Sequence, residues 1–228
     1  GTGSFNHSFD KGHLSVTQKQ GIITILPKGD KPRELLKNWR PISLLNVSYK
    51  IISTCLANGI KQTLDSIIHE NQKGFLSGRF IGENTRLLYD VMKCTEYKHI
   101  LGMLLIDFES AFDSVSWKYM TKILKLFQFG PELRKWIDIL LKDANLCVLQ
   151  NGIFSEFFKI GRGCRQGDPI SPYLFLLCAE IMGAMIRKKR DIKGIKIGEV
   201  KYKLFQYADD TGIILDGSEK SLKNTQTF

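Results

Sequence analysis

Cysteine and histidine are scarce in this sequence, and neither residue type is grouped. The five cysteines are far apart, with no C-x-x-C pair, and the four histidines are scattered. This arrangement argues against a disulfide framework and against a zinc site, and it favours a reducing compartment. Apolar runs stay well short of the about 20 residues that a membrane-spanning helix needs, and no signal peptide opens the chain. We therefore expect an intracellular protein with no membrane partner.

Acidic residues are outnumbered by basic ones. Lys and Arg total 33 against 23 Asp and Glu, which gives a formal charge of +10. An excess of this size suggests a polyanionic partner, most simply nucleic acid, although a basic and soluble surface explains the charge equally well. Hydrophobic residues make up 43% of the chain, so the chain can bury a core and is not disordered.

Internal repeats and low-complexity linkers are also absent, and the hydrophobic pattern changes between strand and helix periods. A nearly unbroken apolar run over 99–108 predicts a strand buried on both faces. Asn151-Gly152 lies between apolar segments and predicts a β-hairpin, and a last hairpin is expected with "YADD" at its bend. The other expected elements are a strand over 22–26 and helices over 44–68, 83–98, 115–130, 131–144 and 170–190. This order predicts an α+β fold in which helices pack on an antiparallel sheet.

Three aspartates suggest a catalytic site. Asp107 ends the apolar run over 99–108, and Asp209 and Asp210 lie at the bend of the last hairpin. Adjacent carboxylates repel one another, so their convergence would require a cation. Carboxylate oxygens without nearby His or Cys favour Mg²⁺ or Mn²⁺, and such a cluster at strand ends fits two-metal phosphoryl transfer. On the hairpin alone, Asp209 and Asp210 are equally well explained as ordinary turn residues.

Five motifs carry a resemblance to a known family, in the family's order, from about Gly21 to about Leu215. "YADD", "LLIDFESAFDSV" and "GRGCRQGDPISPYLF" resemble motifs of the reverse transcriptases of non-LTR (LINE-type) retrotransposons. "ILPKGDKPRELLKNWRPISLLNVSYKI" and "ENQKGFLSGRFIGENTR" look like the fingers motifs of the same family. The resemblance implies right-hand polymerase fingers and palm, and RNA-templated DNA synthesis in the nucleus and cytoplasm. It also implies an RNA template, a DNA primer, dNTP, and two Mg²⁺ ions with Mn²⁺ as a substitute.

The resemblance assigns roles at the reaction centre residue by residue. Asp107 and Asp209 would hold the metal ions together with the carbonyl of Phe108, and Asp210 would be the third acidic residue, closer to the primer end. Phe112 takes the family's steric-gate position, where its ring would exclude a ribose 2′-OH. The plainer interpretation of Phe112 is a core side chain. A gate of this kind counts against an RNA-dependent RNA polymerase, which shares the palm.

Further residues would contact the nucleotide or the nucleic acid. Lys28 and Arg40 would be the cations that hold the triphosphate, which suits a site whose catalysis is positioning plus charge neutralisation. For both residues, the alternative is ordinary solvated charge. Arg165 and Tyr207 would contact template or primer, with simple exposure as the alternative for Arg165. The residues assigned to the nucleotide are Lys28, Arg40, Gln166 and Gly167.

The resemblance also predicts domain boundaries. Residues 1–4 resemble a cloning scar, 5–98 would be mainly fingers and 99–228 mainly palm, with a hairpin near 146–160 that belongs to the fingers–palm region. The chain stops soon after "YADD", so we expect the thumb and a later palm segment to be missing and processive synthesis to be weak. A group II intron-type reverse transcriptase/maturase and an inactive nucleic-acid-binding fragment remain alternatives. "RKKR" at 187–190 is interpreted as a solvated helix end rather than a nuclear-import patch.

Overall fold

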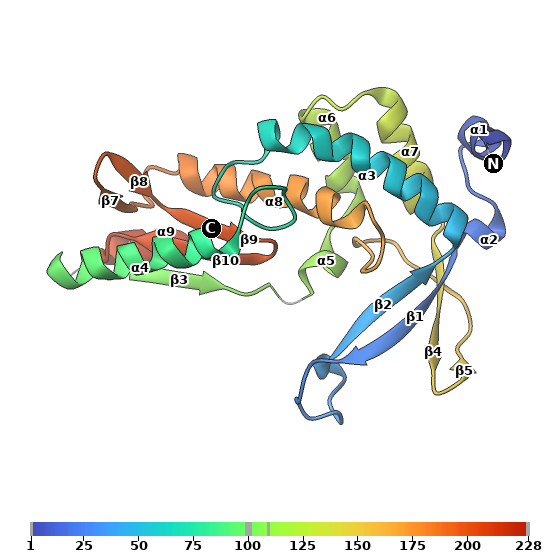
Figure 1. Ribbon diagram of the computed structural model, residues 1–228, viewed down its shortest axis with the longest axis horizontal. Coiled ribbons are helices and arrows are strands. Elements are labelled where there is room, and N and C mark those ends of the chain that lie inside the picture. Colours follow the sequence, from blue (N-terminus) through green and yellow to red (C-terminus); the bar gives the residue numbers. More distant parts are fainter. Residues whose placement is uncertain (1, 99–101, 109, 227–228) are drawn as a thin grey trace. The chain divides into compact units, whose positions relative to one another are not determined.

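The structure is a computed structural model that describes residues 2–98, 102–108 and 110–226 (Figure 1). The chain forms two compact units, each built from two segments. Unit 1 consists of Gly1–Gln62 and Phe112–Phe175, and unit 2 consists of Thr63–Ala111 and Leu176–Phe228. The assignment of 5–98 to fingers and 99–228 to palm stays a prediction. In the part of the chain that the structure describes, no helix has the length and apolar character needed to cross a membrane.

Unit 1 contains a five-stranded sheet with the order β2-β1-β4-β5, in which β6 also pairs with β4. β1 runs antiparallel to β2 and parallel to β4. The hairpin expected at Asn151-Gly152 is confirmed, because both residues have positive φ, 51° and 79°, as a two-residue hairpin turn requires. The strands are β1 (Gln20–Pro27), β2 (Trp39–Leu45), β4 (Asn145–Gln150), β5 (Ile153–Phe154) and β6 (Phe158–Lys159).

The helices expected on either side of Gly130-Pro131 are confirmed as α6 and α7. Pro131 takes the first helical position of α7, where its missing N–H breaks no intrahelical hydrogen bond. A buried cluster that includes Tyr49 of α3, Leu140 of α7 and Leu146 of β4 joins α3 and α7 to the sheet. The helices of this part are α1 (Thr2–Lys11), α2 (Val16–Lys19), η1 (Leu36–Asn38), α3 (Val47–Ile67), α5 (Ala111–Ser114), α6 (Trp117–Leu126) and α7 (Pro131–Leu141).

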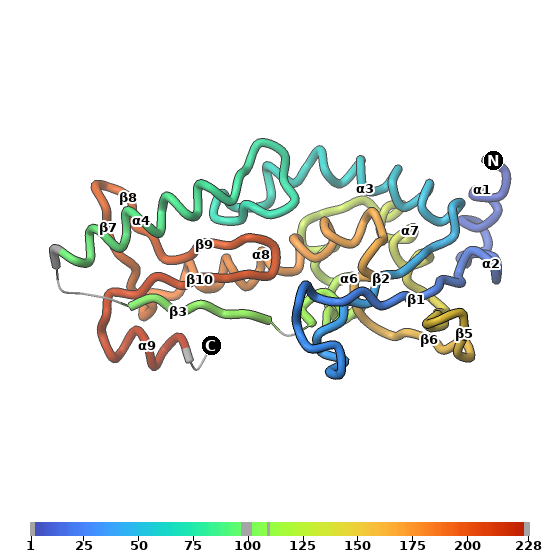
Figure 2. The backbone as a smooth tube through the Cα atoms, turned by 60° about the horizontal axis from the view of Figure 1, so that its bottom comes forward, coloured from blue at the N-terminus to red at the C-terminus, as the bar shows by residue number. Residues whose placement is uncertain are grey.

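Unit 2 is built on a three-stranded antiparallel sheet with the order β3-β10-β9 (Figure 2). On one face, Ile213 shares a buried cluster with Ile186 of α8. On the other face, Ile214 shares a cluster with Val91 of α4. Successive residues of a strand point to opposite faces, so the apolar run of β10 serves both helices. The elements are α4 (Ile81–Lys98), β3 (Gly102–Ile106), α8 (Ser171–Lys188), β7 (Ile195–Ile197), β8 (Val200–Tyr202), β9 (Leu204–Tyr207), β10 (Asp210–Leu215) and α9 (Glu219–Gln226).

The expectation of a strand buried on both faces over 99–108 is wrong. The observed β3 lies at the edge of its sheet, and its side chains alternate in burial. Leu104 and Ile106 pack into the cluster under α8, whereas Met103 and Leu105 are 41% and 65% exposed. The cluster around α4 contains residues of β9 and β10, so the apolar stripe of α4 covers the sheet away from this edge. Residues 99–101 of the expected strand lie outside the described residues.

Candidate active site

The β9–β10 hairpin carries two of the three predicted catalytic aspartates. β9 ends at Tyr207, and Tyr207 pairs with Asp210, the first residue of β10. Ala208 and Asp209 therefore form a two-residue bend, in which Ala208 has a left-handed φ of 54°. The side chain of Asp210 is exposed and that of Asp209 is half-buried. The bend thus presents both carboxylates at the tip of the hairpin, as "YADD" predicted.

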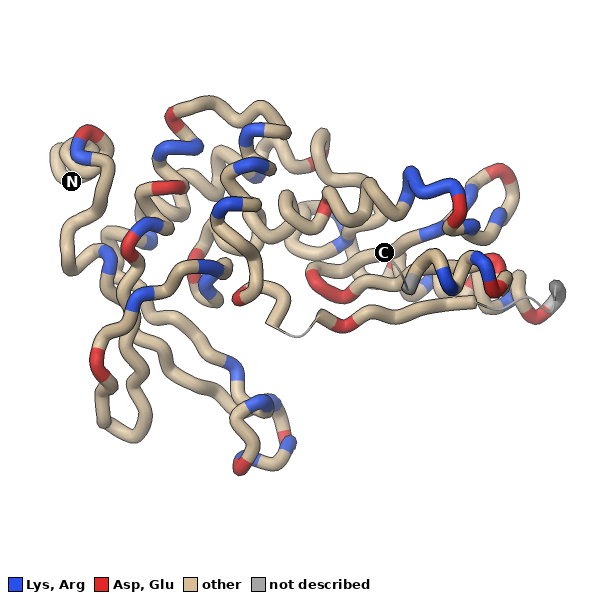
Figure 3. Tube along the Cα trace, turned by 180° about the vertical axis from the view of Figure 1, so that it is seen from behind, with Lys and Arg blue, Asp and Glu red and all other residues tan. Residues whose placement is uncertain are grey.

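The strand register brings Asp107 to the same end of the sheet. Ile106 pairs with Thr211 in the antiparallel β3–β10 ladder, so the next residue, Asp107, lies opposite Asp210. Burial, and then the charges of Asp209 and Asp107, raise the pKa of Asp210. The acidic segments after β3 and at the β9–β10 bend lie next to each other in Figure 3. The fold therefore brings Asp107 near the adjacent pair Asp209 and Asp210, although about 100 residues separate them in the sequence.

The packing of the hairpin depends on a glycine. Gly212 of β10 pairs with Phe205 of β9, and a Cβ at position 212 would collide with the ring of Phe205. Gln206 is 1% exposed, and its Nε2 donates to the Thr211 hydroxyl at 3.3 Å. Both strands are thereby fixed directly behind the bend, and the carboxylates extend from a rigid base.

The carboxylates are chemically suited to a divalent cation, although their side chains are not gathered as a chelating group. Among the described residues, no three His, Cys, Asp or Glu side chains form such a group. Carboxylate oxygens are the ligands that Mg²⁺ and Mn²⁺ prefer. Burial is the main cause of the raised pKa of Asp210, and repulsion by Asp209 and Asp107 adds to it; a cation would relieve that repulsion. Phe108, whose carbonyl is the predicted third ligand, follows Asp107 directly in the chain and has a 37% exposed side chain.

The two cations predicted to hold the triphosphate lie on the β1–β2 hairpin of unit 1. The Lys28 ammonium donates to the carbonyl of Lys37 at 2.8 Å, so this side chain folds onto the turn between the two strands. Arg40 is exposed in β2, where it pairs with Leu26 of β1. Triphosphate contact stays a prediction for both residues.

The loop with Gln166 and Gly167 is attached to β2. The amide of Ser43 donates to the carbonyl of Gln166 at 2.8 Å. Gly167 has a φ of 100°, and a Cβ there would lie 2.6 Å from the carbonyl oxygen of Ser43. Glycine is therefore required at 167 by both backbone conformation and space. The loop is held beside the β1–β2 hairpin, and nucleotide contact stays a prediction.

The expectation that Arg165 contacts a template or is simply exposed needs correction. The residue is 6% exposed, and its guanidinium donates to Asp168 at 3.2 Å, to the Leu140 carbonyl at 3.3 Å and to the Tyr49 hydroxyl. Asp168 in turn accepts from the Tyr49 hydroxyl at 2.7 Å and from the hydroxyl of Ser53. Burial raises the pKa of Tyr49 well above its usual range. A buried charge without partners is costly, so Arg165 depends on these contacts. Through them it ties the loop that carries Gln166 to α3 and α7.

The two aromatic residues with predicted roles are partly exposed. Phe112 is half-buried and stacks on Phe175, with ring centroids 4.2 Å apart and 17° between the planes. The stacking fixes the plane of the ring, and both the gate and the core interpretations of Phe112 stay predictions. Tyr207, assigned to template or primer, is 38% exposed at the end of β9.

The helix end at 187–190 differs from the expected solvated run. Arg187 forms an ion pair with Glu180, and their side chains are only 19% and 6% exposed. Lys203 donates to the carbonyls of Arg187 and Lys189 at 2.9 and 2.8 Å. The side chain of Lys203, which lies between β8 and β9, therefore caps this helix end.

Sequence reasoning missed two buried residues that hold the predicted site. Gln72 bonds both backbone groups of Ala208 in the bend, and Asp168 organises the loop after β6. Gly74 carried the available signal for Gln72, because glycine in a loop often permits a close approach of two backbone segments. A Cβ at Gly74 would collide with the backbone nitrogen of Ala208.

Sequence comparison finds relatives of this chain among the proteins of transposable elements. The chain is 32% identical over 208 residues to the transposon TX1 uncharacterized 149 kDa protein of Xenopus laevis, covering 91% of this chain and 16% of that protein. It is 26% identical over 220 residues to the retrovirus-related Pol polyprotein from type-1 retrotransposable element R2 of Popillia japonica, covering 94% of this chain and 30% of that protein. The chain thus spans less than a third of either relative.

A solved structure shares the fold. Apo telomerase from Candida tropicalis, truncated from the C-terminal domain, matches with a TM-score of 0.61 and 14% sequence identity, covering 94% of this chain and 47% of that chain. The expected α+β polymerase fold is therefore confirmed. The family profile described as reverse transcriptase (RNA-dependent DNA polymerase) matches residues 26–228. The chain belongs to the reverse transcriptase family.

Proposed function

We propose that this chain is the fingers and palm part of an RNA-directed DNA polymerase that serves retrotransposition. The observation that carries the proposal is the β3–β10 register, which places Asp107 opposite Asp210 and beside the bend with Asp209. Family membership supports the reaction class, and the relatives from TX1 and R2 support a non-LTR retrotransposon lineage. The reaction is attack of a primer 3′-OH on the α-phosphate of a dNTP, with RNA as template and pyrophosphate as the leaving group.

The three aspartates have distinct roles in this proposal. Asp107 and Asp209 hold two Mg²⁺ ions, for which Mn²⁺ substitutes, together with the carbonyl of Phe108. Such ions, when bound, make the primer hydroxyl more acidic and neutralise the charge that develops on the phosphates. Asp210, opposite Asp107 and closer to the primer end, adds the negative charge that makes the site selective for divalent cations.

Residues other than the three aspartates bind the nucleotide and the nucleic acid in this proposal. Lys28 and Arg40 offset the charge of the triphosphate, and the loop of Gln166 and Gly167 lies against the nucleotide and the template. Phe112 excludes the ribose 2′-OH, and Tyr207 contacts template or primer. The net charge of +10 supports binding of the RNA template and DNA primer, since phosphate contacts dominate such affinity. We place the reaction inside the cell, in nucleus and cytoplasm.

Single-nucleotide extension of an annealed RNA–DNA primer–template tests the proposal. The wild-type chain is compared with Asp209→Asn, in Mg²⁺ and in Mn²⁺. We expect extension by the wild type in both ions and a loss of about 100- to 1,000-fold in the variant, the scale of removing a principal electrostatic group from a transition state. The exposed Asp10→Asn is the matched control and is expected to extend like the wild type. Extension that Asp209→Asn leaves intact would exclude these carboxylates as the reaction centre.

A further inference from the structure

We propose that Gln72 is a positioning residue that fixes the catalytic bend by pairing with both backbone groups of Ala208. The inference rests on the proposed function, because only that function makes the aspartates next to Ala208 catalytic. It also assigns a task to the loop between α3 and α4, which contributes no carboxylate to the predicted metal site.

The side-chain amide of Gln72 is bonded on both sides. Its Nε2 donates to the carbonyl of Ala208 at 3.0 Å, and its Oε1 accepts from the amide of Ala208 at 2.8 Å and from the amide of Gly74 at 2.9 Å. Gln72 is 2% exposed, so water does not compete for these bonds. A carboxamide offers the same donor and acceptor as a peptide group. The side chain therefore takes the place that a neighbouring strand would have beside the bend.

The backbone on either side of Gln72 prepares this contact. The amide of Gln206 donates to the carbonyl of Asn71 at 2.8 Å, and the amide of Lys73 donates to the carbonyl of Gln206 at 2.9 Å. Asn84 of α4 also donates to the Gln206 carbonyl, at 2.9 Å. The loop thus runs along β9 as a short parallel bridge. Beyond the end of β9, the side chain of Gln72 continues the pairing as far as Ala208.

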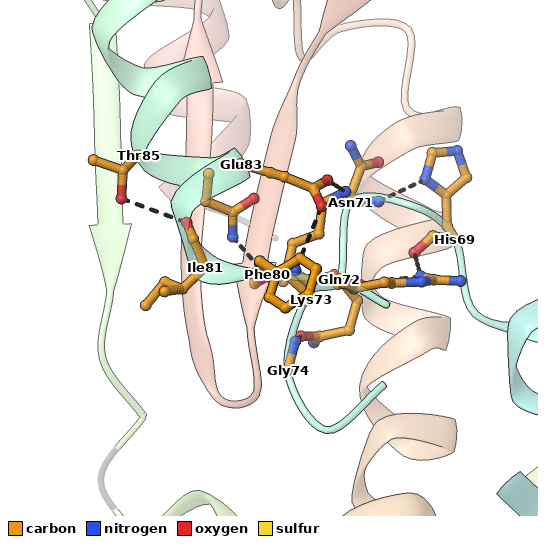
Figure 4. Close-up of polar contacts among 12 residues, drawn as sticks. His69, Asn71, Gln72, Lys73, Gly74, Phe80, Ile81, Glu83 and Thr85 are labelled. Atoms are coloured by element: carbon orange, nitrogen blue, oxygen red, sulfur yellow. Dashed lines mark hydrogen bonds and ion pairs between the residues drawn. The ribbon is translucent and has the colours of Figure 1, made fainter. Parts of the chain in front are cut away.

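The loop is itself held in place, so Gln72 has a fixed base. The guanidinium of Arg79 donates to the carbonyls of Ile68, His69 and Gln72 at 3.0, 2.8 and 3.1 Å. Lys73 forms an ion pair with Glu83 at the start of α4 (Figure 4). Arg79 and Glu83 therefore fix the loop from its two sides, and the position of the Gln72 amide is determined before it reaches the bend.

The bend needs such support because of its own conformation. Ala208 is 6% exposed and has the left-handed φ that residues with a Cβ disfavour. Loss of the Gln72 amide would leave two buried backbone groups without partners, and the bend would relax to another conformation. Asp209, the next residue, would then move relative to Asp107. A misplacement of about 1 Å at a reaction centre is enough to lower the rate about 100-fold.

Amide hydrogen exchange at single-residue resolution tests the contact independently of activity. In the wild type, the Ala208 amide is expected to be protected. In Gln72→Met, which keeps the length of the side chain but removes both polar groups, its exchange is expected to accelerate about tenfold or more. The amide of Ile214, which donates to the Lys203 carbonyl at 2.8 Å in the same hairpin, serves as the internal reference and should stay protected.

Steady-state kinetics test the positioning role. Gln72→Met is expected to lower kcat about 10- to 100-fold, while KM for the dNTP stays within about threefold, because the variant moves a reacting group and removes no nucleotide contact. Gln18→Met is the matched control, since Gln18 is also buried, at 8% exposure, and its Oε1 accepts from the amide of Ser15, the N-cap of α2. Its kcat and its Ala208 exchange should stay within about twofold of wild type, as expected for independent sites in different units.

The outcomes separate the two proposals. An unprotected Ala208 in the wild type, protection that survives in Gln72→Met, or an unchanged kcat would each overturn the role of Gln72. If Gln72→Met does not fold, as Ile214 exchange reveals, Gln72→Glu repeats the kcat test, because it keeps the acceptor and loses the donor. A wild-type chain that extends no primer, with Ala208 protected only when Gln72 is present, counts against the proposed polymerase function and leaves the contact established.

Discussion

Replacement of Asp168 by asparagine is expected to destabilise unit 1 strongly. Asp168 accepts from the Tyr49 hydroxyl at 2.7 Å, the Arg165 guanidinium at 3.2 Å, the Ile170 amide at 3.4 Å and the Ser53 hydroxyl. The side chains of Arg165 and Asp168 are 5% and 1% exposed. Removal of one charge from a buried pair costs about 3–5 kcal/mol, because the other charge stays buried without a partner. The new NH₂ group of asparagine would also face a donor.

Urea unfolding followed by tryptophan fluorescence measures this loss in unit 1, because that unit contains all three tryptophans, Trp39, Trp117 and Trp136. With a urea dependence of about 2 kcal/mol per M, the expected loss lowers the unfolding midpoint by about 1.5–2.5 M. Arg165→Met/Asp168→Leu removes both charges and is expected to lose less stability than the sum of Arg165→Met and Asp168→Leu. A midpoint change below about 0.5 M in Asp168→Asn, or strictly additive losses, would refute the role of the buried pair.

Three further changes follow from described contacts. Gly212→Ala places a methyl group against the Phe205 ring and should lower the stability of unit 2 by about 1–3 kcal/mol, which faster amide exchange at Ile214 would show. Gly59→Ala, where a Cβ meets nothing within 4 Å, is the control. Equal exchange in both variants would contradict the clash. Phe112→Ala is expected to raise the use of ribonucleotides relative to dNTP in primer extension, and an unchanged ratio would remove its gate assignment. Burial raises the pKa of the Cys178 thiol to about 12, so its alkylation by iodoacetamide should increase about tenfold per pH unit between pH 7 and 10, as the thiolate fraction grows. At pH 8 peptide mass spectrometry should show it far slower than at exposed Cys55, and equal rates would contradict the burial.

Local signals in the sequence predicted the elements well. The hairpin at Asn151-Gly152, the helix pair around Gly130-Pro131 and the bend at "YADD" each depend on residues close together in the chain, whose preferences act wherever the segment lies. Pairing between distant segments was not accessible in this way. The parallel contact of β1 with β4 joins strands more than 100 residues apart, and no local preference specifies a partner. The edge position of β3 was missed because an apolar run does not reveal which of its faces a helix covers.

The same distinction between local signals and contacts of distant segments applies to the candidate site. The three aspartates were predicted because Asp209 and Asp210 are adjacent carboxylates at a bend and Asp107 ends an apolar run. The strand register then brings Asp107 near the pair, and the catalytic role of all three stays a prediction. Arg165 was misjudged because its charge alone does not show whether the folded core supplies a buried carboxylate to pair with it. Asp168, three residues later in the chain, supplies that carboxylate. Gln72 was missed because a neutral amide in a polar loop has no distinguishing pattern, and its importance depends on a backbone group that only the folded chain brings near.

The bond between Gln72 and Ala208 also has a place in the order of folding, since it joins residues 136 positions apart. Closing a chain segment of that length costs about 4 kcal/mol of entropy, whereas the β9–β10 hairpin closes over a few residues. The hairpin can therefore form as a local unit, and its bend acquires the final conformation only when the loop docks. A brief local opening that separates loop and bend would leave the remaining core intact. The bend conformation that the predicted catalytic site requires is thus less stable than the fold that supports it.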